Sequence, residues 1–149
     1  MPANVQAIWG LTPNIGGIQF GASANTKSDG TGTIATDMFK AFTAGANGSW
    51  VEKIRLSPEA TTAATATTAT VHRIYVSSVT SGATANTNTY LIQEVSAGAQ
   101  TADHSTTATN FFEIPLGFKL NASYTILVST HVVNAASTNW VAVVFGEDF

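Results

Sequence analysis

From Gly32 to the C-terminal residue, the chain consists of short runs of alternating apolar and polar residues separated by clusters of Gly, Asn, Ser and Thr. A half-buried β-strand repeats its side-chain pattern every two residues, whereas an amphipathic helix repeats every three to four, and the helical repeat is hard to find here. An all-β fold is therefore predicted. The runs that carry this prediction are Trp50 to Leu56, "TVHRIYVSS", "YLIQEVS", "FFEIPL", "ASYTILVSTHVV" and "NWVAVVFGEDF".

The chain has 149 residues and no cysteine, so it is long enough for one packed core and has no disulfide to hold a smaller one. We predict a single antiparallel β-sandwich over residues 27–149. Residues 1–26 mix Pro and paired Gly with isolated apolar residues and are predicted to form an extended arm with one short strand at most. This arm carries Trp9, Ile18 and Phe20, which must pack onto its own domain or onto a neighbour.

Three local features refine the strands. Glu52 interrupts the alternation of the run that starts at Trp50, which indicates a β-bulge or an exposed edge. Pro115 should end its strand or place it at the edge of a sheet, because proline lacks a ladder donor. The turn "NAAST" is predicted to join the last two runs as a hairpin. Strict alternation gives the run from Trp50 to Leu56 two faces. Trp50, Ile54 and Leu56 lie on one face, opposite Val51, Lys53 and Arg55.

Charge is scarce, at 10% of residues with a net charge of −3. A nucleic-acid ligand is not expected, because the chain has no basic stripe to neutralise phosphates. The N-terminus does not match a secretory signal peptide, and no apolar run is long enough for a membrane helix, so no membrane partner is expected.

The residue types that usually carry chemistry do not fall into a recognisable pattern. His72, His104 and His131 lack the short spacing that makes a metal site specific, and Asp103 beside His104 is the one carboxylate that could assist acid–base work. "SDGTGT" is expected to be a turn, with calcium binding as the alternative. No nucleophile elbow is present. No enzyme activity, metal or cofactor is therefore expected.

Two kinds of surface residue remain as binding candidates. Trp9, Trp50, Tyr75 and Trp140 could form a platform on which sugars stack, although packing in a core or subunit interface is the commoner role of such aromatics. Lys53 and Arg55, with Glu52 beside them, suit complementary contacts to a second copy or another protein, and the alternative is a solvated strand face. The candidate interface residues are Trp9, Ile18, Phe20, Trp50, Lys53 and Arg55.

The order of several phrases resembles the small decoration, or cement, proteins of tailed bacteriophages. These phrases are "DGTGT", "FTAGANGS" followed by "VEKIRL", "TATVHRIYV", "YLIQEVS", "FEIPLGFKLNASYTILVST" and "WVAVVFGEDF", and together they cover most of the chain from Asp29 onward.

The resemblance implies a jelly-roll-like β-sandwich that assembles as a homotrimer on the outer surface of an icosahedral capsid, at or near three-fold and quasi-three-fold positions. There it would bind the major capsid protein and stabilise the shell, after synthesis in the host cytoplasm. The stretch from Trp9 to Phe20 would face the shell or a neighbouring copy. A carbohydrate-binding or tail-fibre-like receptor-binding module is the alternative function.

Overall fold

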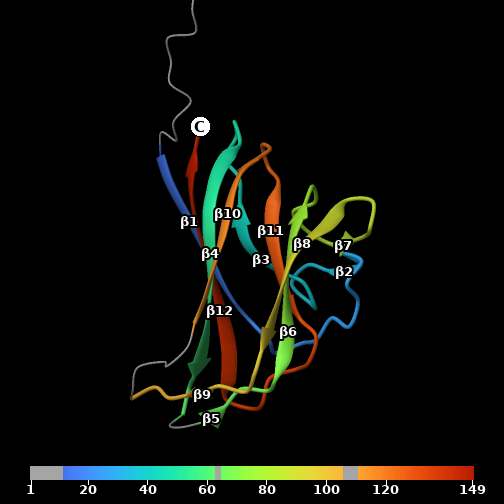
Figure 1. The fold of residues 1–149 in the computed structure, drawn as a ribbon. Coiled ribbons are helices and arrows are strands. Elements are labelled where there is room, and N and C mark those ends of the chain that lie inside the picture. The colour runs from blue at the N-terminus through green and yellow to red at the C-terminus, as the bar shows by residue number, and fades with distance from the viewer. Residues whose placement is uncertain (1–11, 63–64, 106–110) are drawn as a thin grey trace, which may run out of the picture.

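The structure is a computed structural model that describes residues 12–62, 65–105 and 111–149, and it is a β-sandwich of two four-stranded antiparallel sheets (Figure 1). Sheet 1 contains, in spatial order, β1 (Thr12–Phe20), β12 (Thr138–Asp148), β4 (Ser49–Ala60) and β10 (Phe112–Leu120). Sheet 2 contains β3 (Phe39–Thr43), β11 (Thr125–Thr130), β6 (Thr70–Ser77) and β8 (Thr89–Ala97). Two small ribbons pair β2 (Gly32–Thr33) with β7 (Ala83–Thr84) and β5 (Thr65–Ala66) with β9 (Thr101–Ala102).

This architecture confirms the predicted antiparallel β-sandwich. Between successive long strands the chain crosses from one sheet to the other at every step except β6 to β8. The predicted hairpin of β11 and β12 is therefore wrong, because these two strands lie in different sheets. β11 pairs with β3 and β6, while β12 pairs with β1 and β4.

The core fills the space between the two inward faces. Sheet 1 contributes fully buried apolar side chains at alternate positions of β4 and β12, and sheet 2 contributes those of β6 and β11. Such alternation is what a strand with one face on a core requires. The central members of the cluster are Val51, Ile54, Leu56, Ile74, Ile126, Val128, Trp140, Ala142 and Val144.

The predicted irregularity at Glu52 is a β-bulge. On β12, Phe145 lies opposite Lys53 while the next residue, Gly146, lies opposite Val51, so Glu52 is an extra residue. The bulge switches the faces of β4. Val51 is fully buried, with Ile54 and Leu56, whereas Trp50 is 37% exposed and shares the outer face with Lys53 and Arg55. The faces predicted by strict alternation were wrong for Val51 and Trp50 for this reason.

Pro115 lies inside β10 rather than at its end. Among the described strands β10 pairs with β4 alone, so it is an edge strand, the position in a sheet where proline is tolerated. The edge position predicted for this proline is confirmed.

Part of the expected N-terminal arm belongs to sheet 1. β1 is nine residues long and pairs with β12 along its whole length. Phe20 is 1% exposed and belongs to the core. A Cβ added to Gly16 would lie 2.1 Å from the carbonyl oxygen of Ala41 in β3, so this glycine lets the two sheets approach closely along one flank. Residues 1–11, including Trp9, lie outside the described residues, and the domain boundary at residue 26 stays a prediction.

His72 is a core residue of β6. Its ring contacts those of Phe20 and Trp140 edge-on, at centroid distances of 5.1 and 4.5 Å. Neither ring nitrogen has a hydrogen-bond partner within the described residues. Burial disfavours the charged form and lowers the pKa of His72 to about 4 from its usual 6.5.

We expect this histidine to make stability depend on pH in a defined window. The unfolded chain binds a proton near pH 6.5 and the folded chain only near pH 4, so stability is complete above about pH 6.5 and is lost as the pH falls towards about 4. The free energy of unfolding should drop by about 2 kcal/mol between pH 7 and pH 5. Urea denaturation at both pH values measures it.

The matched variant is His72→Phe, which keeps an aromatic ring among aromatic neighbours and removes the titrating group. Whatever its absolute stability, its loss between pH 7 and pH 5 should be much smaller. Equal losses in the two proteins would show that His72 is not responsible.

Candidate protein interface

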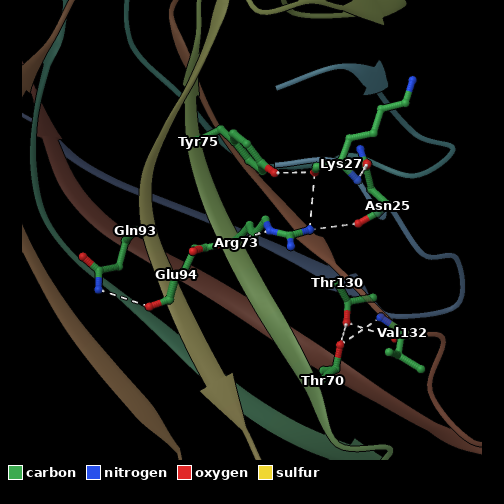
Figure 2. Close-up of polar contacts among 9 residues, drawn as sticks. All are labelled: Asn25, Lys27, Thr70, Arg73, Tyr75, Gln93, Glu94, Thr130 and Val132. Carbon is green, nitrogen blue, oxygen red and sulfur yellow. Dashed lines mark hydrogen bonds and ion pairs between the residues drawn. The ribbon is translucent and has the colours of Figure 1, made fainter. Parts of the chain in front are cut away.

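The outer face of sheet 2 is covered by the chain's own loops, and Arg73 holds one of them in place (Figure 2). The whole Arg73 residue is only 8% exposed. The Nη1 atom donates to the carbonyl oxygens of Asn25 at 3.1 Å and Lys27 at 3.3 Å, and Nε donates to a carboxylate oxygen of Glu94 at 2.8 Å. The Tyr75 hydroxyl donates to the same Lys27 carbonyl at 3.2 Å. These bonds fasten residues 25–27 over the sheet.

Apolar packing completes the cover on sheet 2. Met38, Tyr75 and Leu127 are fully buried together on this side, with Ile34 partly buried against them. Ile34 and Met38, which lie between β1 and β3, therefore form a second, smaller core with Tyr75 and Leu127 on the outer side of sheet 2.

The outer face of sheet 1 has no such cover from the described part of the chain. The strand registers place its outward side chains in rungs that run across the sheet. One rung contains Ile15, Phe145, Lys53 and Pro115, and the next contains Gly17, Val143, Arg55 and Glu113. We call this surface the bare face and define it by Ile15, Trp50, Lys53, Arg55, Glu113, Val141, Val143 and Phe145.

The bare face is an apolar band bordered by charge. Ile15 is 63% exposed and Trp50 37%, so both side chains present apolar surface to the outside. Val141, Val143 and Phe145 of β12 lie between them with partial exposure. A mixed surface of this kind, with aromatics and arginine beside aliphatic residues, is typical of protein interfaces.

An ion pair orients one of the charges. Lys53 pairs with Glu113 across β4 and β10, and its Nζ lies 5.4 Å from the ring centroid of Phe145. The hydrogen bond to Glu113 raises the pKa of Lys53, and the same bond lowers the pKa of Glu113. Both groups are exposed, so this pair positions the side chains and contributes little to stability.

Arg55 has a different partner. Its guanidinium carbon lies 3.8 Å from the ring centroid of Phe111, which is 47% exposed. Stacking of this kind holds the guanidinium in place and leaves its N–H groups able to bind a further acceptor.

The six predicted interface residues therefore separate. Trp50, Lys53 and Arg55 come together on the bare face. Ile18 is partly buried against the core and Phe20 is fully inside it, while Trp9 lies outside the described residues. The apolar members Ile15 and Phe145 were not predicted. The apolar residues on both parities of "WVAVVF" were the available signal, because a strand with one solvated face would alternate.

The other candidate sites have ordinary structural roles in the described residues. The Asp29 carboxylate accepts a hydrogen bond from the Thr31 backbone N–H at 2.9 Å, which makes "SDGTGT" a turn and lowers the pKa of Asp29. Within the described ranges, no group of three or more His, Cys, Asp or Glu side chains could hold a metal ion. In the same ranges, no helix is long and apolar enough to cross a membrane.

The aromatic platform is not formed as a unit. Trp140 and Tyr75 are fully buried, in the main core and under the loops of sheet 2 respectively, whereas Trp50 is exposed. Of the four aromatics proposed for sugar stacking, Trp50 is the one that the described structure exposes.

No family model matches the chain, and no curated protein matches it in sequence. Among solved structures, it is similar to a chain of the cyanophage Pam1 capsid asymmetric unit, with 15% identity and a TM-score of 0.43, over 100% of this chain and 93% of that one. A similarity at this level does not establish a shared fold or function.

Two arginines test the difference between the covered and the bare face. Replacing Arg73 by Met should lower the free energy of unfolding by about 2–3 kcal/mol, because two carbonyl groups and Glu94 lose a charged donor. Arg55→Met removes the same charge from an exposed site and should cost no more than about 0.5–1 kcal/mol. Urea denaturation at pH 7 measures both. Equal costs would contradict the difference.

Proposed function

We propose that this protein is a structural component of a bacteriophage virion. In this proposal it binds the outer surface of the capsid as a homotrimer, at three-fold and quasi-three-fold positions, where it contacts the major capsid protein and stabilises the shell. The proposal includes a jelly-roll arrangement of the eight long strands. It also includes synthesis in the host cytoplasm and a role without enzyme activity or a cofactor. The resemblance of its sequence phrases to decoration proteins supports this class of function.

The structural observation that carries the proposal is the bare face. One outer face of the sandwich is covered by the chain's own loops, whereas the other presents Ile15, Trp50, Phe145 and oriented charges to the outside. Exposed apolar patches rimmed by charge mark protein contacts. We assign this face to the major capsid protein, with Arg55 as its central polar contact.

A trimeric arrangement explains how a modest patch can hold a shell. Three copies bound around a three-fold axis make each weak contact three times, and the linked contacts add through effective concentration. A ligand that binds the assembled shell and not its separated subunits stabilises the assembly by mass action. No catalytic group is needed for this function.

Charge reversal on the bare face tests the proposal. Arg55→Glu should weaken binding to capsids that lack this protein by at least about tenfold, because a central polar contact becomes repulsive. The matched control is Lys40→Glu, an equal charge reversal at an exposed site on β3, which should change binding by less than about threefold. Co-sedimentation with capsids at increasing protein concentration gives both affinities.

Two outcomes would contradict the assignment. Equal binding of Arg55→Glu and the wild-type protein would exclude the bare face as the capsid contact. Absence of any capsid binding by the wild-type protein, together with glycan binding that is lost in Trp50→Ala, would favour the receptor-binding alternative.

A further inference from the structure

The turn between β3 and β4 contains the only Asn-Gly pair of the sequence, Asn47 and Gly48. The Gly48 backbone N–H donates to the carbonyl oxygen of Gly45 at 3.0 Å, which closes a four-residue turn with Ala46 and Asn47 at its tip. Both tip residues are exposed, whereas Gly48 is buried. The amide side chain of the pair therefore meets water, while the backbone that follows it is held by the fold.

The fold requires the glycine of this pair. Gly48 has a φ of +89°, which residues with a Cβ rarely adopt. A Cβ at this position would also lie 2.6 Å from the carbonyl oxygen of Leu120 in β10. Because the turn cannot accept a larger residue after Asn47 without strain, the chemistry of an Asn-Gly pair is built into it.

An asparagine before a glycine is chemically labile, because glycine has no side chain to shield its backbone nitrogen. The Gly48 nitrogen forms a bond to Cγ of Asn47, the bond from Cγ to Nδ2 breaks, and Nδ2 leaves as ammonia with the proton of the Gly48 nitrogen. Water then opens the succinimide ring that has formed and leaves a carboxylate. Opening at Cγ gives aspartate, and opening at the main-chain carbonyl carbon gives isoaspartate.

Two hydrogen bonds slow this reaction in the closed turn. The Gly48 N–H is engaged by Gly45, and Nδ2 of Asn47 donates to the carbonyl oxygen of Phe149 at 3.1 Å. Both bonds must break before the Gly48 nitrogen can reach Cγ. Exposed turns open locally at a much smaller free-energy cost than global unfolding, so the reaction can proceed from an opened turn of the folded protein.

Asn121 provides a comparison within the same chain. It is also exposed in a turn, the one before β11, where its carbonyl oxygen accepts a hydrogen bond from the Tyr124 N–H at 3.1 Å. The residue after it is Ala122, whose methyl group hinders approach of the backbone nitrogen. Asn121 should therefore react more slowly than Asn47.

Asp29 and Gly30 form the related Asp-Gly pair, which can close the same ring with loss of water. An ionised carboxylate is a poor leaving group for this step. The Asp29 carboxylate accepts a hydrogen bond from the Thr31 backbone N–H at 2.9 Å, which lowers the pKa of Asp29 and favours its ionised form. This pair is thus protected at neutral pH.

We propose that Asn47 is a site of spontaneous deamidation in the folded protein, at a rate set by opening of the turn that ends at Gly48. The product carries a carboxylate, which accepts hydrogen bonds only and so cannot donate to Phe149 as the amide does. The modification needs neither a capsid nor a second copy, so it is tested separately from the proposed function.

Peptide mass spectrometry of the full-length protein tests this site. The folded protein is kept at pH 8.5 and 37 °C and digested at intervals. A mass gain of about 1 Da should appear on the peptide with Asn47 at least about tenfold faster than on the peptide with Asn121. Isoaspartate at position 47 is counted by enzymatic methylation of its main-chain carboxylate.

Two variants separate the chemistry from the position. Asn47→Gln keeps an amide but lengthens the side chain by one carbon, and it should lose the fast mass gain. Ala122→Gly creates a second Asn-Gly pair at a residue without a positive φ, and it should speed the reaction at Asn121 at least about fivefold. Equal rates at Asn47 and Asn121 in the wild-type protein, or an Asn47 that stays intact, would overturn the proposal.

The same measurement in urea tests the role of the turn. Unfolding removes both hydrogen bonds and should raise the rate at Asn47 at least about threefold, whereas the rate at Asn47 in the folded protein should be unaffected by Ala122→Gly. A folded protein that reacts as fast as the unfolded chain would overturn control by the turn.

Discussion

The bulge at Glu52 determines what each face of sheet 1 presents. One extra residue in β4 lets Val51 join Ile54 and Leu56 in the core while Trp50 joins Lys53 and Arg55 outside. The neighbouring strands are adapted to it. Gly117 of β10 has a φ of +63°, and a Cβ at Gly146 of β12 would lie 2.5 Å from the carbonyl oxygen of Trp50. Lys53 and Arg55 lie on the outer side of β4, which is a central strand of sheet 1. A third of the chain's six basic residues are therefore part of the bare face.

Coverage of the sandwich is uneven in two directions, and the proposed function follows from the first of them. Sheet 2 is covered on its outer side through Arg73 and a small second core, whereas the described part of the chain leaves the outer side of sheet 1 uncovered. The β1 and β3 flank is closed by direct backbone approach, whereas β8 and β10 make few contacts with each other among the described residues. A domain that leaves one face uncovered is suited to making a contact there, which we assign to the capsid.

The sequence was sufficient to predict the strands whose local pattern matches their environment. β6, β8, β11 and β12 were all identified, and the bulge at Glu52 and the edge position of Pro115 were recognised from single residues. β3 was not predicted, because five residues give too short a pattern, and the partners of β11 and β12 were wrong because pairing is set by contacts far apart in the chain. Of the residues on the bare face, the sequence singled out Trp50, Lys53 and Arg55 but not Ile15 or Phe145. Ile15 and Phe145 share a rung with Lys53 only through strand registers that the sequence does not display.

The central claim is that this protein is a stoichiometric component of a capsid surface, and the most direct test is its copy number. Purified particles of the virus that encodes the chain would be analysed by quantitative mass spectrometry, with the major capsid protein as the internal reference. The account predicts a ratio of about one copy per capsid subunit, as expected for trimers at every three-fold and quasi-three-fold position. A few copies per particle, or none, would contradict it.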